Sequence, residues 1–138
     1  MNMNQTFYCN GELTVNQGSV LWEHTYHCAN GEVHNLQNMA QALDNSCNLW
    51  FIQAAQTLQP TVFYDYIRAF GFTQPTGVDL PSETRWTSVY NAQQMAEVDT
   101  NLYTAAFGQN EAITPMQMAT AIAAIANGGY LVTPYIVD

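Results

Sequence analysis

The chain has 138 residues, the size of one domain or of part of a larger one. Apolar residues make up 48% and aromatic residues 12%, which excludes a disordered tail. Eleven acidic residues outnumber two basic ones, Arg68 and Arg85, so the net charge is −9 and there is no lysine. This composition excludes lysine-dependent phosphate loops and Schiff-base chemistry. It also predicts no nucleic-acid partner and no attraction to an anionic membrane, because both need a basic surface.

Short β-strands are predicted in the first third of the chain. Residues 7–9, 13–15 and 20–22 have β-like composition, and Asn-Gly or Gln-Gly pairs separate them, as in small hairpins. No signal peptide is expected, because the first residues lack a basic segment followed by an apolar one. Residues 119–126 are the most apolar stretch, far shorter than the ~20 residues of a bilayer helix, so no membrane segment is expected in this chain.

Three helices are predicted in the middle of the chain. Apolar side chains recur at helical spacing over residues 36–45, and a second helix begins after Ser46 and runs through residue 58. Pro60 suits the first position of a third helix, because its missing N–H is not needed there. Gly71 is expected to end that helix as a C-cap.

The C-terminal half begins with residues 72–90, which show no periodicity and predict an extended connection. A capping box is expected at Asn91, with Gln94, and a stronger one at Thr114, with Pro115 and Gln117. The helix after Thr114 has one apolar stripe, Met118, Ile122 and Ile125. The sequence Asn-Gly-Gly should end it, and residues 131–137 read as the beginning of a strand. The predicted fold is mainly α (α+β), with minor β structure at the two ends.

Cysteine and histidine residues offer two further possibilities. Zinc ligands could come from Glu23, His24, His27, Cys28 and His34, with Cys9 and Cys47 elsewhere. Because the spacing matches no paired ligand signature, we expect no metal and no cofactor, with a small zinc-binding domain as an alternative. The odd cysteine count suits one disulfide in an exported protein or three thiols in a cytosolic one. Cys9 and Cys28 are the candidate disulfide pair, which spacing alone leaves open.

No motif for a nucleophile is present. Gly-x-Ser-x-Gly is absent, Cys47 has no supporting motif, and the acidic residues are scattered singly. Ser46 and Asn48, at the break between two predicted helices, could point into one cleft. There the hydroxyl could relay a proton, and the amide could donate to and accept from a peptide-like ligand. Taken alone, the same pattern is also that of an ordinary helix N-cap.

In its wider context, Ser46-Cys47-Asn48 resembles the Ser-x-Asn motif of the transpeptidase domain of bacterial penicillin-binding proteins. Other segments resemble that family in the same order along the chain: residues 66–72, 76–81 with Glu83, 106–109, 113–119 and 126–129. Asn110 stands where the family commonly has glycine, a local change in a turn.

The resemblance implies the helical lobe of the β-lactamase/penicillin-binding-protein transpeptidase fold. By carry-over, Ser46 relays a proton towards the leaving amine, and Asn48 hydrogen-bonds the substrate or β-lactam amide. The family also uses Ser-x-x-Lys, whose serine is the nucleophile, and Lys-Thr-Gly. A chain without lysine has neither, so residues 1–138 are expected to be a partial transpeptidase domain, inert by itself.

The expected function is therefore that of a fragment of a peptidoglycan D,D-transpeptidase, which binds penicillin and cross-links stem peptides through a serine outside this chain. The parent protein is expected to be extracytoplasmic and membrane-anchored, and its ligands to be a stem peptide or a β-lactam. The alternative is a non-catalytic, degenerate penicillin-binding-like interaction module. Because a lobe of a larger domain exposes apolar surface, self-association through that face is also expected.

Overall fold

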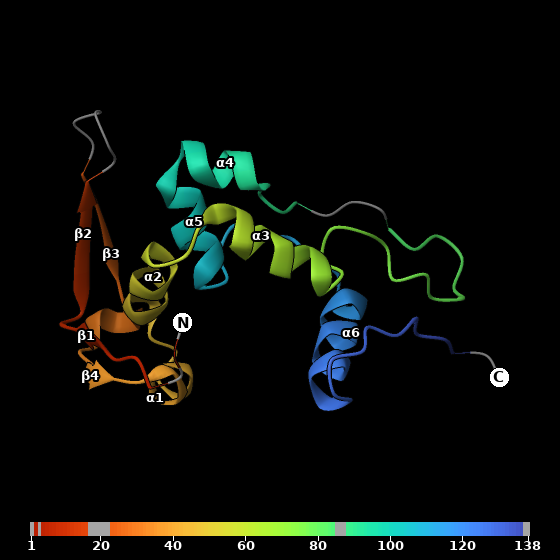
Figure 1. Cartoon of the computed structure of the whole chain (residues 1–138), viewed down its shortest axis with the longest axis horizontal. Helices are drawn as coiled ribbons and strands as arrows, with labels where there is room; N and C mark the ends of the chain where they lie inside the picture. The colour runs from red at the N-terminus through yellow and green to blue at the C-terminus, as the bar shows by residue number, and fades with distance from the viewer. Residues whose placement is uncertain (1, 3, 17–22, 85–87, 137–138) are drawn as a thin grey trace.

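The computed structural model describes residues 2, 4–16, 23–84 and 88–136. Four short strands and a 3₁₀ turn precede six helices (Figure 1). In chain order the elements are β1 (Phe7–Cys9), β2 (Glu12–Asn16), β3 (Glu23–His27), η1 (Ala29–Gly31), β4 (Asn35–Gln37), α1 (Met39–Asp44), α2 (Asn48–Gln56), α3 (Pro60–Ala69), α4 (Ala92–Glu97), α5 (Asp99–Ala106) and α6 (Pro115–Ala126).

The strands form two antiparallel pairs, β1 with β4 and β2 with β3. The predicted strands at 7–9 and 13–15 are confirmed, whereas the one at 20–22 lies outside the described residues. Strands β3 and β4 were not predicted. Leu36, expected in a helix, pairs with Tyr8 in the β1–β4 ladder instead.

The three helices predicted in the middle of the chain are confirmed as α1, α2 and α3. Helix α1 begins three residues later than expected because Asn38 is its N-cap: the Asn38 side chain accepts from the Gln41 N–H, and the Gln41 side chain accepts from the Asn38 N–H. Pro60 occupies the first turn of α3 as predicted, and Gly71 follows that helix with φ +81°.

The main core lies between the strands and helices α2, α4 and α5. Trp50 of α2 is almost completely buried, makes an edge-on contact with Phe7 and donates its indole N–H to the Gln37 carbonyl at 2.9 Å. Helix α5, which the sequence reading did not anticipate, contributes the buried Leu102 and Tyr103. This core fixes the start of α2, where the predicted Ser-x-Asn pair lies.

Helix α3 connects this core to α6 (Figure 1). The described parts of the connection between α3 and α4, residues 70–84 and 88–91, contain turns and bends and no helix or strand beyond the bridge at Ser88, so the predicted connection without regular periodicity is confirmed there, although it is not extended throughout. The capping box of α6 is confirmed, with Thr114 accepting from the Gln117 N–H at 3.1 Å. The side chain of Gln117 is buried and donates to the Gln74 carbonyl at 2.8 Å, which ties α6 to the segment after α3. The capping-box residue Gln117 thus holds the start of α6 against the segment that follows α3.

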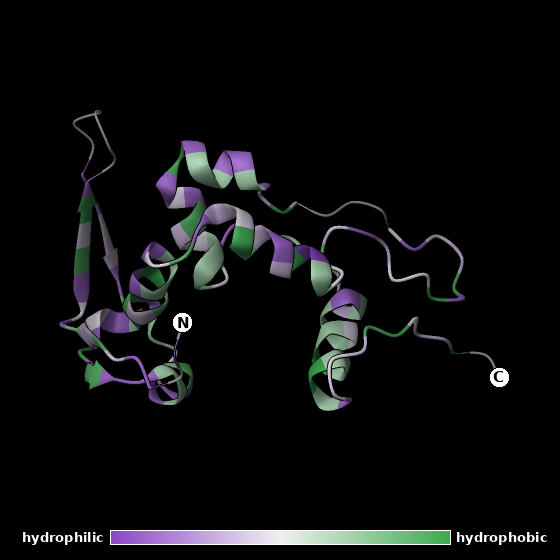
Figure 2. Ribbon diagram, in the orientation of Figure 1, coloured by the Kyte–Doolittle hydropathy of each residue, from purple (hydrophilic) through white to green (hydrophobic). Residues whose placement is uncertain are grey.

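Much of the α6 ribbon has the colour of hydrophobic residues in Figure 2. The stripe of Met118, Ile122 and Ile125 is exposed, whereas small and polar residues, including Thr120 and Ala121, are buried. The α6 stripe is therefore an apolar surface of the described chain.

The strand predicted for residues 131–137 is wrong over its described part. Residues 131–136 form no ladder, because a strand needs a neighbouring edge and none of the described segments supplies one there. The minor β structure of the described chain accordingly lies almost entirely at its N-terminal end, apart from one isolated bridge between Ser88 and Ala112. No helix within the described ranges is long and apolar enough to cross a bilayer.

Candidate functional site

Ser46 is held in a left-handed backbone conformation, with φ +48°. It follows the C-cap of α1, and its N–H donates to the Leu43 carbonyl at 3.1 Å, while the Cys47 N–H donates to the Ala42 carbonyl at 2.9 Å. These two bonds form a Schellman motif, whose left-handed position is usually glycine. A serine there carries a steric cost that glycine would not, and Ser82, with φ +67°, carries it as well. Ser46 is therefore a candidate functional residue through its place beside Asn48, with the backbone cost as an accompanying feature.

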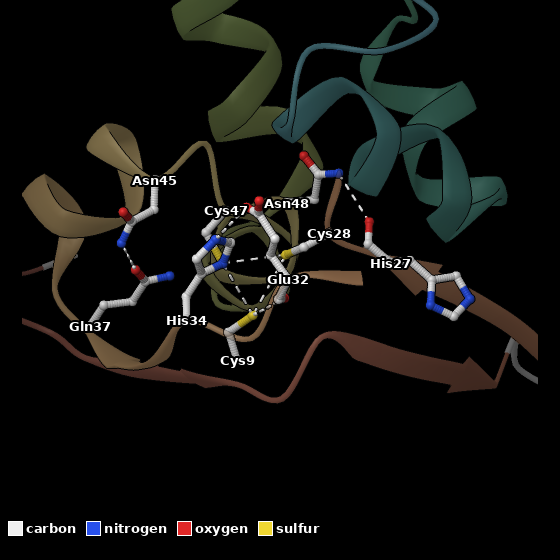
Figure 3. Close-up of polar contacts among 9 residues, drawn as sticks. All are labelled: Cys9, His27, Cys28, Glu32, His34, Gln37, Asn45, Cys47 and Asn48. Atoms are coloured by element: carbon white, nitrogen blue, oxygen red, sulfur yellow. Dashed lines mark hydrogen bonds and ion pairs between the residues drawn. The ribbon is translucent and has the colours of Figure 1, made fainter. Parts of the chain in front are cut away.

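Asn48 is the first residue of α2, and its position is also fixed by a hydrogen bond. The Asn48 Nδ2 donates to the carbonyl oxygen of His27, at the end of β3, at 3.0 Å (Figure 3). This bond fixes the orientation of the Asn48 side-chain amide relative to the core. The short turn between α1 and α2 thus projects Ser46 and Asn48 from one side of the core.

The two side chains line one open groove of about 340 Å³. We call it the Ser46–Asn48 groove, and its lining residues are Leu43, Ser46, Asn48, Phe51, Ala106 and Phe107. Phe107 is supported from behind by an edge-on contact with Tyr26, with ring centroids 6.1 Å apart. A hydroxyl and an amide on an otherwise apolar wall suit a ligand that presents both an amide and aliphatic groups.

Three thiols and an imidazole meet just behind the Ser-x-Asn turn (Figure 3). Their ligand atoms all lie within 4.8 Å of one another, and we call the set the thiol–imidazole cluster: Cys9, Cys28, His34 and Cys47. The candidate disulfide between Cys9 and Cys28 is not formed, because their sulfur atoms are 3.6 Å apart and both cysteines are free. Of the other candidate ligands named from the sequence, Glu23, His24 and His27 lie outside the cluster.

The thiols in the cluster have different pKa values. Burial raises the pKa of Cys47 to about 12 and also raises that of Cys28. At Cys9, burial is outweighed by hydrogen bonds, chiefly from the backbone of His34 and Gly11, and the pKa is lowered to about 7. The site therefore favours a thiolate at Cys9, and it supplies backbone donors that stabilise negative sulfur.

A second motif segment is organised by Glu83. Its Oε1 accepts from the Thr76 hydroxyl at 2.6 Å and the Thr76 N–H at 2.7 Å, and its Oε2 accepts from the Gly77 N–H at 2.9 Å. The Thr76 hydroxyl bond, followed by these backbone bonds, lowers the pKa of Glu83. The spacing from Thr76-Gly77 to Glu83 is thus explained by a carboxylate that closes the intervening loop.

Comparisons with known proteins identify the family and the fold of the chain. The family model for the penicillin-binding protein transpeptidase domain matches residues 1–138. Stage V sporulation protein D of Bacillus subtilis (strain 168) is 38% identical over 103 residues, covering 75% of this chain and 16% of that protein. The D,D-transpeptidase domain of a peptidoglycan glycosyltransferase from Eggerthella lenta is 24% identical with a TM-score of 0.79, covering 100% of this chain and 34% of that chain.

Penicillin-binding protein A from M. tuberculosis, solved as a ceftriaxone acyl-enzyme complex, is also similar. It has a TM-score of 0.77 and 22% identity, and the alignment covers 98% of this chain and 29% of that chain. The chain thus belongs to the penicillin-binding protein transpeptidase family, and its fold is a helix-rich lobe of the transpeptidase fold. It spans only 16% of the length of the sporulation protein that it matches.

Proposed function

We propose that residues 1–138 form one wall of the active site of a peptidoglycan D,D-transpeptidase, and that the attacking serine and its lysine lie outside this sequence. The observation that carries the proposal is that Ser46, in a strained backbone conformation, and Asn48 line the same groove. Membership of the transpeptidase family supports it. The absence of lysine means that Ser-x-x-Lys and Lys-Thr-Gly must come from elsewhere.

In this proposal, the Ser46 hydroxyl relays the proton lost by the attacking serine: it accepts that proton as it gives its own to the leaving amine, when the peptide or β-lactam bond breaks. The hydroxyl is suited to this role because it is both a donor and an acceptor. Asn48 binds the amide of the substrate, with its own orientation set by the bond to His27. Neither group can form the acyl-enzyme by itself, because the nucleophile that attacks the bond is a serine outside this chain.

The proposed ligands are a stem peptide of peptidoglycan and the β-lactams that mimic it. Such ligands match the groove because they combine an amide with aliphatic side chains. The substrate lies outside the cytoplasmic membrane, so we place the parent protein there, with a membrane anchor outside this chain. We also propose that the isolated chain self-associates through the α6 stripe, because Ile122 and Ile125 are exposed together.

Acylation by a fluorescent penicillin tests the proposed function. The isolated chain is expected to form no covalent adduct, whereas the product of the full reading frame that contains it should be labelled. In that product, Ser46→Ala and Asn48→Ala should each lower the acylation rate on the order of 10² to 10³-fold, the usual effect of losing an acid–base or binding group. Ser88→Ala and Asn4→Ala, both at exposed positions, are matched controls that should leave the rate unchanged.

A labelled band at the mass of the isolated chain would contradict the proposal. A reading frame that encodes no Ser-x-x-Lys would favour the non-catalytic interaction module instead. Self-association is measured separately by sedimentation velocity: Ile122→Glu combined with Ile125→Glu should convert an oligomer to a monomer. A wild-type chain that sediments as a monomer would rule self-association out.

A further inference from the structure

We infer that the thiol–imidazole cluster is a structural zinc site, with Cys9, Cys28, His34 and Cys47 as its four ligands. No feature of a Ser-x-Asn active site requires three cysteines and a histidine at these positions. They come from three regions of the sequence, around residue 9, residues 28–34 and residue 47, and the fold brings their ligand atoms together (Figure 3).

Three of the six distances between the ligand atoms match the edges of a tetrahedron, and the other three are no longer than 4.8 Å. With Zn–S near 2.3 Å and Zn–N near 2.0–2.1 Å, a tetrahedral ion spaces two sulfur atoms about 3.8 Å apart, and a sulfur and a nitrogen about 3.5 Å apart. The Cys9 and Cys28 sulfur atoms are 3.6 Å apart, and those of Cys28 and Cys47 are 3.7 Å apart. The Cys9 sulfur is 3.5 Å from the Nδ1 of His34. All three distances agree with the tetrahedron to within 0.2 Å.

A disulfide fits these atoms less well. The sulfur atoms are far from the bonded distance of about 2.05 Å, and an odd number of cysteines leaves one thiol over. A plain apolar core of thiols would not explain why the His34 ring is directed at the Cys9 sulfur. A bound zinc ion accounts for the positions of all four side chains.

The surroundings are those of a ligand sphere. The other ring nitrogen of His34, Nε2, is 3.4 Å from Glu32 Oε2, and a metal-bound histidine commonly donates its second N–H to a carboxylate. The Glu32 carboxylate would thus hold the imidazole in the orientation that presents Nδ1 to the ion.

The site is closed, which makes it structural rather than catalytic. Cys9 and Cys47 are fully buried, Cys28 is 3% exposed and the His34 side chain is 9% exposed, so four protein ligands leave no position for water. Three thiolates and one imidazole favour Zn²⁺ over Mg²⁺ or Ca²⁺, which prefer oxygen ligands. On binding, Zn²⁺ forms three Zn–S bonds and one Zn–N bond, and the protons that the three thiols still carry are released to solvent.

The zinc site lies directly behind the proposed active-site wall. Cys47 is the middle residue of Ser46-Cys47-Asn48, so one ligand bond would fix the turn from which both site residues project. Cys28 directly follows His27, whose carbonyl holds the Asn48 amide. The ion would therefore join β1, the end of β3, the start of β4 and the start of α2 at one point.

Elemental analysis of the purified full chain tests the inference. We expect one zinc per chain in the wild type, and less than about a fifth of that in Cys28→Ser and His34→Ala, since losing one of four ligands opens the site. His24→Ala and His27→Ala are matched controls, because both histidines belong to β3 but not to the cluster, and they should retain full zinc. The inference would be overturned if the wild-type chain is purified without zinc and still binds no metal after zinc is added.

A spectroscopic measurement covers the case in which a ligand variant fails to fold. Co²⁺ added to the reduced, metal-free wild-type chain should give sulfur-to-cobalt charge-transfer absorption and the intense visible bands of a tetrahedral complex, saturating at one Co²⁺ per chain. Weak bands typical of six-coordinate cobalt, or a disulfide between two of the cysteines under non-reducing mass spectrometry, would contradict the inference. Neither readout depends on penicillin acylation, so the zinc site and the proposed function can fail separately.

Discussion

The sulfur atoms of Cys28 and Cys47 lie 3.7 Å apart, which places the residue after β3 against the residue between Ser46 and Asn48. One position further along, the Asn48 amide donates to the His27 carbonyl. Two neighbouring residues of the Ser-x-Asn turn are thus held by two neighbouring residues at the end of β3. Side chains at the Ser46–Asn48 groove are positioned by this double attachment rather than by the short helix α1 alone.

Removing the metal should destabilise the chain. A structural zinc ion contributes folding free energy directly, and losing about 3 kcal/mol would lower the melting temperature of a domain of this size by roughly 10 °C. Differential scanning calorimetry of the zinc-loaded chain, with and without a chelator, measures this shift. The His27→Ala variant should show the same shift as the wild type, and a melting temperature that is insensitive to the chelator would contradict the prediction.

Ser46→Gly should stabilise the chain while impairing its function. Glycine adopts a positive φ without the steric cost that serine bears, so the free energy of unfolding should rise by about 1 kcal/mol. Acylation of the full reading-frame product should fall as it does for Ser46→Ala, because the hydroxyl is lost. Urea denaturation measures the free energy of unfolding. Ser88→Gly is the control: because Ser88 lies in a β-bridge, glycine there should not raise the free energy of unfolding. A destabilised Ser46→Gly chain would show that the backbone strain is not real.

Gln117→Leu should weaken the attachment of α6. The Gln117 amide is buried and donates to Gln74, and its Oε1 accepts from the Thr114 N–H at 2.8 Å. Leucine has a similar volume but leaves these buried groups without partners, at a cost of about 2 to 3 kcal/mol. Chemical denaturation should detect this loss. The exposed Gln93→Leu, which removes one bond to Glu97, should change stability by less than about 0.5 kcal/mol.

Glu111 should make stability depend on pH. Burial raises its pKa from 4.5 to about 7, and its Oε2 is buried without a partner among the described residues. A carboxyl whose pKa is raised by folding favours the folded state at low pH, and this advantage is lost as the pH rises from about 4.5 to 7. The loss should amount to about 1 to 2 kcal/mol, because water near the carboxyl reduces the effect.

The measurement for Glu111 is urea denaturation at several pH values between 4 and 8. Glu111→Gln should remove that part of the decline, whereas Glu12→Gln, at an exposed carboxylate of β2, should retain it. The comparison between variants is needed because the net charge of −9 also disfavours the fold as carboxylates ionise. Identical profiles for the wild type and Glu111→Gln would contradict the prediction.

Local signals along the chain predicted the helices well. The capping boxes at Asn91 and Thr114, and the proline at the start of α3, are confirmed because each depends on residues within one turn of the helix. The prediction failed where partners were distant in sequence. Leu36 fits a helical period, but its pairing with Tyr8 keeps it in β4, and the start of the helix moves to Asn38.

The amino-acid sequence by itself determined the family resemblance, the helical character and the candidate pair Ser46 and Asn48, since ordered motifs and periodicity are local properties. Only the tertiary structure decided that this pair shares one groove and that Cys9, Cys28, His34 and Cys47 converge. The four residues have no ligand spacing that a linear pattern could reveal. They meet because two strand pairings and the packing of α2 bring separate segments to one point. Long-range contacts of that kind cannot be predicted from the spacing of residues along the chain.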